Sequence, residues 1–576
     1  MRGHGGLQLT NPQYEILDEE DAETIHTGRI VPVYERAGTV TPKMQRRIVW
    51  EALQRLPGDL ADHLPEPIRV RHEWPSRQAA LFGAHFPPSD APLAALNAFR
   101  TPAQQRLIFE EAFLFQLGVM ARRRLAAAEE KPQPIHVDDR IRESARKVLP
   151  FRLTTGQKGA LKEIVEDLQR PHPMNRLLQG DVGAGKTIVA LLAALVAMEN
   201  GLQVAFMAPT EILAEQHFYN ISRLLQASRF RVALLTGAIG TAARRERLAE
   251  IEAGTIHLIV GTHALVQGDV RFAALGLVVI DEQHRFGVMQ RATLRAKGLK
   301  PDVLVMTATP IPRTLALTVY GDLDVSMIRD TPPGRMPVRT AAKPESRRDE
   351  VYGFVREQLD AGRQAYVIYP LVEESSKVDL KAATEMADHL AQEVFPAYRV
   401  GLLHGRLKQD GKERVMKAFA TGELQLLVST TVVEVGVDVP NASVMIVEHA
   451  ERFGLSQLHQ LRGRVGRDRY QSYCFLLYQS PLSDEARGRL KAMTETTDGF
   501  EIAEKDLQLR GPGDLFGTRQ AGLPTFRLVD LIRDRDLLDL AQREAAAWIE
   551  TTAPTPAAVE RLVQNWESRF RLIEVG

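Results

Sequence analysis

Cysteine is almost absent from this chain: Cys474 is the single one among 576 residues. One cysteine cannot form an internal disulfide, so the sequence excludes a disulfide-stapled secreted domain and fits a reducing compartment. Cys474 lies in the apolar stretch SYCFLLY, which predicts a buried strand in which the thiol is a small core residue.

Long apolar runs and an excess of charge are also lacking. The longest purely apolar run, residues 188–198, is far shorter than the ~20 residues of a membrane span, so we expect a buried helix there. The N-terminus shows no secretory signal pattern, and we expect a cytoplasmic protein with no membrane contact. Basic and acidic residues balance at 73 each, so any nucleic-acid surface must be a local patch.

Metal-binding spacings are missing too. Neither H-E-x-x-H nor C-x-x-C occurs, and His263, His404 and His459 form no metal pattern. Each of these histidines could be a satisfied core or surface residue. The metal we expect is Mg²⁺, arriving with a nucleotide.

The organisation of the chain predicts an α/β protein with two lobes. From about Leu149, apolar strands of four to seven residues alternate with helical patterns, which indicates parallel sheets covered on both faces. The Pro/Gly-rich break DTPPGRMP at 330–337 separates the two lobes. Residues 41–130 are mostly helical in pattern, and apolar residues at helical spacing predict a helix over 106–124. After Pro481, the two short helical runs SDEARGRLKAMTET and FEIAEKDLQL predict a helical hairpin.

A phosphate-binding motif is present at 180–187. GDVGAGKT matches G-x-x-x-x-G-K-[ST] and lies between a strand-like RLLQ and a helix that ends at Gly201. Its glycines let backbone N–H groups surround phosphates, Lys186 reaches the β- and γ-phosphates, and Thr187 supplies a hydroxyl to Mg²⁺. The alternative is a glycine-rich turn that binds nothing. We expect ATP here.

An acidic pair follows the apolar strand LGLVVI. Asp281 and Glu282 stand at its carboxyl end, where ligands bind in open α/β sheets. We expect Asp281 to hold Mg²⁺ through water and Glu282 to polarise the attacking water. Without the phosphate-binding motif, such a pair would more often be a helix cap.

Seven long motifs occur in the order typical of superfamily-2 helicases, and they resemble the RecG family of ATP-dependent DNA branch-migration helicases. The similarity extends from about Leu149 to the end of the chain, and more weakly into the helical region before it. The motifs are LLQGDVGAGKT, APTEILAEQH, GTHALVQ, DEQHRFGVMQR, MTATPIPRTLAL, TVVEVGVDVPNA and ERFGLSQLHQLRGRVGR.

This resemblance implies roles for individual residues. Gln157 resembles a glutamine that contacts adenine, and Gly180, Asp181, Val182, Gly183, Ala184 and Gly185 complete the nucleotide site with Lys186 and Thr187. Arg464 and Arg467 resemble arginines that the second lobe directs at the γ-phosphate, where a planar cation spreads over the phosphoryl oxygens. Arg462 and Arg469 are expected to be solvated loop charges. Coupling of ATP state to movement is implied for His284, Thr307, Thr309 and Gln460.

The glycine-rich stretch EKDLQLRGPGDLFGTRQAG at 504–522 resembles the RecG translocation motif. Its glycine content predicts an ordered loop rather than a helix. The resemblance implies that Arg510, Arg519 and Gln520 tie the helical hairpin to the arginine-bearing loop of lobe 2.

Contacts with DNA are expected from loops that meet phosphates and read no sequence. Thr210, Thr262, Thr430 and Thr431 are candidates, although each could equally be a strand-end or turn threonine. The resemblance implies branched double-stranded DNA, namely forks and Holliday junctions, as substrate in recombination and repair. It also suggests single-strand DNA-binding protein as a partner, and a monomer.

The N-terminus departs from the family. RecG proteins carry a wedge domain, an OB-type barrel of about five strands, whereas only the first ~40 residues could belong to one here. Either the start is mis-set, or the protein works without a complete wedge. The expected segments are a wedge remnant at 1–40, a helical linker at 41–148, lobe 1 at 149–333, lobe 2 at 334–481, and a helical hairpin with the translocation motif at 482–576.

Three alternatives to a RecG-type motor stay open from the sequence. One is another superfamily-2 motor, either an RNA helicase or the translocase module of a transcription-repair coupling factor. Another is a wedge-less double-strand DNA translocase that does not unwind. The last is a non-hydrolysing DNA-binding protein descended from a motor, against which Lys186, Asp281 and Arg467 argue.

Overall fold

The structure, a computed structural model, divides the chain into two compact units. One unit comprises Met1–Ala121 with Thr525–Trp566, and the other comprises Arg122–Pro524 with Glu567–Gly576. The described residues are 2–3, 6–7, 25, 29–36, 38–58, 60–127, 130–282, 293–308, 323–332, 334–370, 376–430, 439–467, 470–514 and 526–552.

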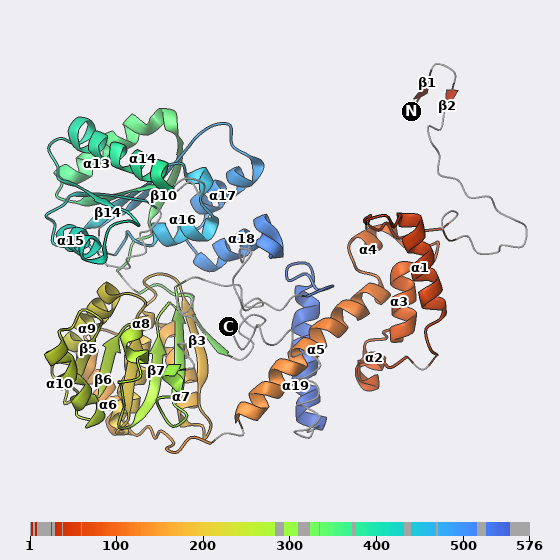
Figure 1. Cartoon of the computed structure of the whole chain (residues 1–576), viewed down its shortest axis with the longest axis horizontal. Helices are drawn as coiled ribbons and strands as arrows, with labels where there is room; N and C mark the ends of the chain where they lie inside the picture. Colours follow the sequence, from red (N-terminus) through yellow and green to blue (C-terminus); the bar gives the residue numbers. More distant parts are fainter. Residues whose placement is uncertain are drawn as a thin grey trace, which may run out of the picture. The chain divides into compact units, whose positions relative to one another are not determined.

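Lobe 1 of the larger unit is a seven-stranded parallel sheet (Figure 1). The strand order β5-β6-β4-β7-β8-β3-β9 differs from the chain order, so the connections cross over the sheet, as expected for parallel strands. The strands are β3 Asn175–Gly180, β4 Gln203–Met207, β5 Val232–Leu235, β6 Leu258–Gly261, β7 Leu275–Ile280, β8 Asp302–Thr307 and β9 Asp324–Ile328.

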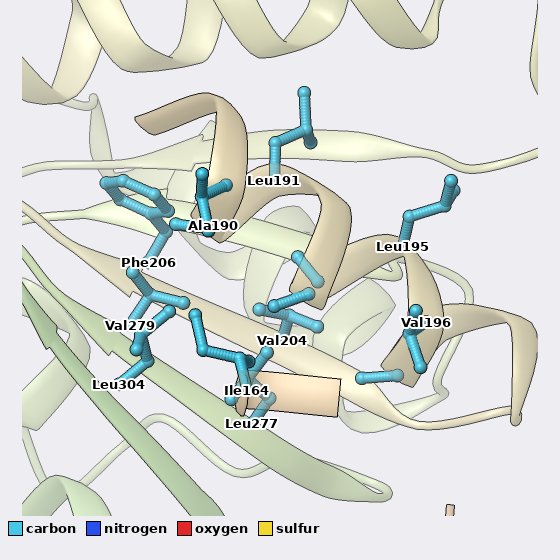
Figure 2. Packing of buried hydrophobic residues seen from close by; sticks show 14 of the residues in the cluster. Ile164, Ala190, Leu191, Leu195, Val196, Val204, Phe206, Leu277, Val279 and Leu304 are labelled. Atoms are coloured by element: carbon cyan, nitrogen blue, oxygen red, sulfur yellow. The ribbon is translucent and has the colours of Figure 1, made fainter. Parts of the chain in front are cut away.

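Alternate residues of these strands feed two separate cores, because successive side chains point to opposite faces of a sheet. Val204, Phe206, Leu277, Val279 and Leu304 belong to one hydrophobic cluster, shared with α7 Thr155–Gln169 and α8 Lys186–Glu199 (Figure 2). Their neighbours along the strands, such as Ala205 and Val278, belong to the cluster on the other face. The near-continuous apolar strands predicted from the sequence are therefore buried on both faces. Lobe 1 also contains, among its described residues, α9 Glu211–Leu225, α10 Thr241–Glu252 and the 3₁₀ turn η1 His263–Val266.

The segment before lobe 1 packs onto it. Ile135 and Ile141 join the lobe 1 core, the latter from α6 Asp139–Val148. Lys131 is buried, and its Nζ donates to the Leu168 carbonyl at 2.6 Å and lies 3.2 Å from the Asp302 carboxylate. The predicted linker at 41–148 thus includes residues that contact lobe 1, and the predicted segment boundaries stay predictions.

Lobe 2 is a six-stranded parallel sheet of order β10-β15-β14-β11-β13-β12. Its strands also alternate between two cores, with Tyr366 and Ile368 on one face and Ala365 and Val367 on the other. The two RecA-like lobes confirm the predicted fold class. The strands are β10 Arg339–Pro344, β11 Gln364–Tyr369, β12 Val400–Leu403, β13 Leu426–Thr430, β14 Ala442–Val447 and β15 Tyr473–Tyr478; the helices are α13 Arg348–Asp360, α14 Ser376–His389, α15 Gln409–Ala420 and α16 Leu455–Arg462, with short turns η3 Glu345–Arg347, η4 Leu390–Val394 and η5 Ala450–Arg452.

Two strands were not predicted from the sequence. β9 (DVSMI) and β10 (RTAAKP) carry polar residues and alternate weakly, because each pairs with only one neighbour at the edge of its sheet. Proline at the end of β10 is tolerated in such an edge position.

The predicted helical hairpin is present as α17 Asp484–Glu495 and α18 Gly499–Asp514. The helical run predicted over 500–509 is confirmed, but the expectation of a glycine-rich loop was wrong for residues 510–514, because α18 continues to Asp514. Ile502 packs in the lobe 2 core, so tertiary contacts hold the helix register and outweigh the low helix propensity of glycine. Residues 515–522 lie outside the described part of the chain.

The smaller unit is helical. Its long helix α5, Pro102–Ala127, confirms the helix predicted for 106–124. The Glu111 carboxylate on α5 accepts the backbone N–H groups of Arg527, Leu528 and Val529, at 2.8 to 3.1 Å, so the C-terminal segment is fastened to α5. The unit also contains α1 Pro42–Gln54, α2 Glu66–Arg71, α3 Arg77–His85, α4 Leu93–Asn97 and α19 Arg535–Thr552.

Little of the predicted wedge remnant at 1–40 is described. The short strand β1 Arg2–Gly3 pairs antiparallel with β2 Gly6–Leu7, and the remnant stays a prediction. Among the helices that the structure describes, none has the length and hydropathy needed to cross a membrane.

Candidate nucleotide site between the two lobes

The phosphate-binding motif connects the end of β3 to the start of α8. Gly183 and Gly185 have φ of 80° and 84°, in the region that favours glycine, and α8 begins at Lys186. Lys186 is buried, and its Nζ donates to the carbonyls of Gly180 at 2.8 Å and Asp181 at 3.1 Å. Burial lowers the pKa of Lys186, opposed by the nearby carboxylates of Glu282 and Asp281. The loop thus keeps its cation beside the helix N-terminus, as a phosphate site requires.

The acidic pair reaches the same place from β7. Strand β8 lies between β3 and β7, so the carboxyl ends of the three strands bring Gly180, Thr307 and Asp281 to one edge of the sheet. Thr307 is the last residue of β8 and is buried.

Asp281 is held by a neighbouring histidine. His217 Nε2, on α9, lies 2.8 Å from Asp281 Oδ2, and Asp281 Oδ1 accepts the Glu282 N–H at 3.1 Å. Burial alone would raise the pKa of Asp281, but the hydrogen bond and charge of His217, with the charge of Lys186, lower it. The carboxylate is therefore kept ionised, which is the form that coordinates a hard cation.

Glu282 adopts a strained backbone conformation. Its φ is 51°, which is uncommon for a residue with a side chain and indicates local backbone strain. One of its carboxylate oxygens, Oε2, lies 3.5 Å from the backbone nitrogen of Ala308, just after β8.

Lobe 2 contributes α16 and the turn that follows it. Gln460, Arg464 and Arg467 all line the cavity that contains Lys186 and Asp281. Arg467 Nε donates to the Gly463 carbonyl at 3.2 Å, and burial together with the charge of Arg335 lowers the pKa of Arg467 to about 10. It is still a cation at neutral pH.

The cavity has a volume of about 830 Å³ and opens between the lobes. Besides the sequence-predicted groups, residues of α8 and α9 and Phe151 also line it. The walls include Val182, Gly183, Gly185, Lys186, Thr187, Asp281, Glu282, Ala308, Gln460, Arg464 and Arg467.

Gln157 does not line this cavity. Its side chain is buried, with Oε1 accepting the Thr154 N–H at 3.0 Å and Nε2 donating to the Ala184 carbonyl at 2.9 Å. The glutamine therefore caps the N-terminus of α7 and is hydrogen-bonded to Ala184 in the phosphate-binding loop. Its predicted contact with adenine stays a prediction.

Several other predicted residues can be placed, and some cannot. Thr210 is the N-cap of α9, with its hydroxyl accepting the Leu213 N–H at 3.3 Å. Thr262 and Thr430 are buried at strand ends, and within the described part of the chain their hydroxyls have no hydrogen-bond partner. Outside the described residues lie His284, Thr309, Thr431, Arg469, Arg519 and Gln520; Arg510 falls within α18, but its side chain is not described.

The expectation for Arg462 was wrong. It is buried, and its guanidinium donates to the carbonyls of Met493 at 3.1 Å, Thr496 at 2.8 Å and Thr497 at 3.1 Å. These carbonyls lie at the end of α17, where helical backbone has no partners of its own, and the cation satisfies them.

Sequence reasoning missed three residues: His217, which contacts Asp281 within lobe 1, and Arg335 and His459, which contact the phosphate-binding loop from lobe 2. Arg335 donates to the Val182 carbonyl through Nη1 and to the Gly466 carbonyl, 2.9 Å away, through Nε. His459 contacts Asp181. His217 and His459 stand inside the quoted motifs APTEILAEQH and ERFGLSQLHQLRGRVGR, which was the available signal. Cys474 is buried in the lobe 2 core, and burial raises its pKa to about 12.

Two RecA-like lobes with a phosphate-binding loop, an acidic pair and opposing arginines around one cavity define a superfamily-2 helicase motor. Profile comparisons match DEAD/DEAH box helicase at residues 154–318, Helicase conserved C-terminal domain at 350–469, and ATP-dependent DNA helicase RecG, domain 3, C-terminal, at 496–566. The chain belongs to the RecG family of ATP-dependent DNA helicases, as the following relatives show.

RecG of Synechocystis is 48% identical over 98% of this chain, and RecG of Bacillus subtilis is 47% identical over 91%. RecG of Escherichia coli O157:H7 is 43% identical over 98%. Among solved structures, RecG bound to a three-way DNA junction superposes with a TM-score of 0.69, at 44% identity over 89% of this chain.

The chain spans about two thirds of some of these relatives. It covers 67% of the Synechocystis protein, 76% of the Bacillus protein and 81% of the Escherichia coli protein. It covers 66% of the chain in the junction-bound structure.

Proposed function

We propose that this chain hydrolyses ATP between its two lobes and uses the resulting lobe movement to drive double-stranded DNA at forks and Holliday junctions. One observation carries the proposal: Lys186 and Asp281 of lobe 1 line the same cavity as Arg464 and Arg467 of lobe 2. A nucleotide bound there would contact both lobes, so its cleavage would change how strongly they attract each other.

The lobe 1 residues fit a magnesium nucleotide. Thr187 offers a hydroxyl and Asp281 a carboxylate to one cavity, and oxygen ligands of this kind suit Mg²⁺, which keeps most of its waters and needs few protein groups. Among the described residues, no cluster of three or more His, Cys, Asp or Glu side chains forms a separate metal site. A bound Mg²⁺ would neutralise phosphate charge; Lys186 would bind phosphate oxygens and Glu282 would orient the attacking water.

The lobe 2 residues complete the site. Arg464 and Arg467 would stabilise charge that develops on the phosphoryl oxygens, a role for which the planar guanidinium is suited. Gln460, Thr307, Thr309 and His284 are proposed to sense the nucleotide state. Gln157 is proposed to contact adenine at the loop that it already holds.

The DNA part of the proposal is supported by a relative. The RecG structure at 44% identity is bound to a three-way DNA junction. We extend branched DNA to this chain, with phosphate contacts from the segments of Thr210, Thr262, Thr430 and Thr431. The stretch 504–522, which carries Arg510, Arg519 and Gln520, is proposed to transmit lobe movement to the DNA. Interaction with single-strand DNA-binding protein, a monomeric state and a cytoplasmic location belong to the same proposal.

The test compares how strongly forked, four-way and linear duplex DNA of equal length stimulate ATP hydrolysis. Single-stranded DNA and duplex RNA are tested in the same way. We expect forked and four-way DNA to stimulate most. Stimulation by RNA alone would favour an RNA helicase, and equal stimulation by all duplexes without strand separation would favour a translocase that does not unwind.

The binding part is measured separately. Binding of forked DNA without ATP should weaken steeply as salt rises, because each phosphate contact releases condensed counterions. A flat salt response would contradict phosphate-based contacts.

A further inference from the structure

His459 lies at the junction of the nucleotide loop and the helical hairpin. It is buried on α16, and its Nε2 is 2.7 Å from Oδ1 of Asp181 in the phosphate-binding loop. Its other ring nitrogen, Nδ1, lies 2.9 Å from a guanidinium nitrogen of Arg462. The ring therefore joins a loop of lobe 1 to a cation of lobe 2.

The partners of His459 determine its tautomer. Arg462 can only donate hydrogen bonds, so Nδ1 must be the accepting nitrogen. The ring hydrogen then lies on Nε2 and is donated to the Asp181 carboxylate. The chain of donors thus runs in one direction, from Arg462 through the imidazole to Asp181.

Beyond Arg462 the chain of contacts reaches the hairpin. The same guanidinium donates to the carbonyls of Met493, Thr496 and Thr497, at the end of α17 and in the turn before α18. A second link runs from α16 to α18, where the Ser456 hydroxyl donates to buried Asp506 at 2.7 Å. Helix α16 is therefore bound to both helices of the hairpin.

The end of α16 packs tightly on the phosphate-binding loop. A Cβ placed on Gly463 would lie 2.9 Å from Cβ of Val182, so only glycine permits this approach. Asp181 also accepts the N–H of Val182 at 2.6 Å, which couples its carboxylate to the loop backbone. A rearrangement of this loop around phosphate must therefore move or break the bond to His459.

We propose that His459 is a positioning residue that transmits the state of the phosphate-binding loop to the helical hairpin, through Asp181 on one side and Arg462 on the other. The inference rests on the proposed ATP-driven DNA movement. His459 does not line the nucleotide cavity, so it acts through its neighbours and not on the nucleotide. Its loss should uncouple hydrolysis from DNA movement and leave hydrolysis itself in place.

Two substitutions of His459 each remove one of its two contacts, either the one with Asp181 or the one with Arg462. In His459→Gln the side-chain amide can reach Asp181 but offers no acceptor at the position of Nδ1. In His459→Asn the side-chain oxygen can replace Nδ1 as the acceptor for Arg462, but the amide is too short to reach Asp181. His459→Ala cuts both, and His389→Gln, at a half-exposed histidine of the same lobe, is the matched control.

The measurements are DNA-free ATP hydrolysis, the KM for ATP, and the DNA strand displaced per ATP hydrolysed, with circular dichroism and thermal melting as folding checks. For all three variants we expect hydrolysis and KM within about twofold of the unaltered chain and displacement per ATP about tenfold lower, which is a typical coupling between sites. The control should behave as the unaltered chain.

Other outcomes overturn the inference. Normal displacement in His459→Asn would mean that the ring only supports Arg462, and normal displacement in His459→Gln would mean that it only supports the loop. A proportional fall of hydrolysis and displacement in all variants would mean a purely structural role. Failure of the proposed function is distinguishable, because the unaltered chain itself would then show no DNA-stimulated hydrolysis.

Discussion

His217 Nε2 on α9 lies 2.8 Å from Oδ2 of Asp281 at the end of β7, so a helix that follows one strand orients the carboxylate that follows another. The imidazole also lies against Phe206, with ring centroids 4.7 Å apart, which limits its rotation. A partly buried carboxylate held in this way is pre-oriented for a cation.

His217→Ala should weaken magnesium use. Loss of an outer hydrogen-bond partner typically costs on the order of 10–100-fold in metal affinity or activity, so we expect the Mg²⁺ concentration for half-maximal hydrolysis to rise within that range. Mg²⁺-dependent binding of a fluorescent ATP analogue provides a second measurement, independent of turnover. His217→Gln, which keeps a donor, should recover part of the loss, and exposed His136→Ala is the control. An unchanged magnesium requirement would contradict this role.

Lys186→Ala should abolish ATP hydrolysis. The substitution removes the cation that contacts the loop carbonyls and would contact phosphate, so we expect a fall in kcat of order 10²-fold or more. Steady-state phosphate release with and without forked DNA measures it. Lys162→Ala, at an exposed lysine on α7, should leave hydrolysis unchanged. Persistent DNA-stimulated ATP hydrolysis in the Lys186 variant would contradict the assignment of the nucleotide site.

Glu282→Gln should separate ATP binding from hydrolysis. The amide keeps the size of the side chain but cannot accept a proton from water, so kcat should fall by about 10²–10⁴-fold. Binding of an ATP analogue should stay close to normal, because the loop and Lys186 are intact. Equilibrium binding and single-turnover hydrolysis measure the two effects. Normal turnover would show that another residue orients the water.

Arg467→Ala should slow hydrolysis through the loss of a lobe 2 contact. An arginine that stabilises phosphoryl transfer contributes about 10³–10⁵-fold to kcat, and we expect a loss in that range. Arg347→Ala, at an exposed arginine of the same lobe, is the control, and thermal melting checks that the partly buried position of Arg467 tolerates alanine. An unchanged kcat in a folded Arg467 variant would show that Arg467 does not take part in hydrolysis.

Asp302 should make stability depend on pH. Burial raises the pKa of Asp302 from 3.8 to about 6, against the opposing charge of Lys131. Between these values the folded chain binds a proton that the unfolded chain has released, so the free energy of unfolding should fall as pH rises from about 4 to 6, by about 3 kcal/mol.

Asp302→Asn should remove that slope, because the amide does not titrate. Urea unfolding of both proteins at several pH values gives the difference directly, and Asp139→Asn, at a carboxylate 96% exposed, controls for a general charge effect. Parallel pH dependences of the Asp302 variant and the unaltered chain would contradict the prediction.

Most of the strands and helices could be predicted, because the apolar pattern along the sequence matches the burial of these segments in the folded lobes. Strands such as β4 and β7 are continuous apolar runs, since helices cover both of their faces, and the helix after Lys186 follows from its motif. The prediction failed at β9 and β10, where an edge position relaxes the apolar pattern, and at residues 510–514, where packing of α18 outweighs the low helix propensity of glycine.

The sequence by itself predicted groups that the structure brings to one cavity: a phosphate-binding loop and an acidic pair, from residue type and spacing, and two arginines, from the family resemblance. Only the tertiary structure decided which histidines and arginines act at the lobe contact. His217, Arg335, His459 and Arg462 look like ordinary polar residues in sequence. His217 pairs with Asp281, Arg335 with Val182 and His459 with Asp181, each far away along the chain. Arg462 donates to carbonyls at the end of α17 and in the turn before α18. Such hydrogen bonds depend on how strands are ordered and how elements meet, which no local pattern encodes.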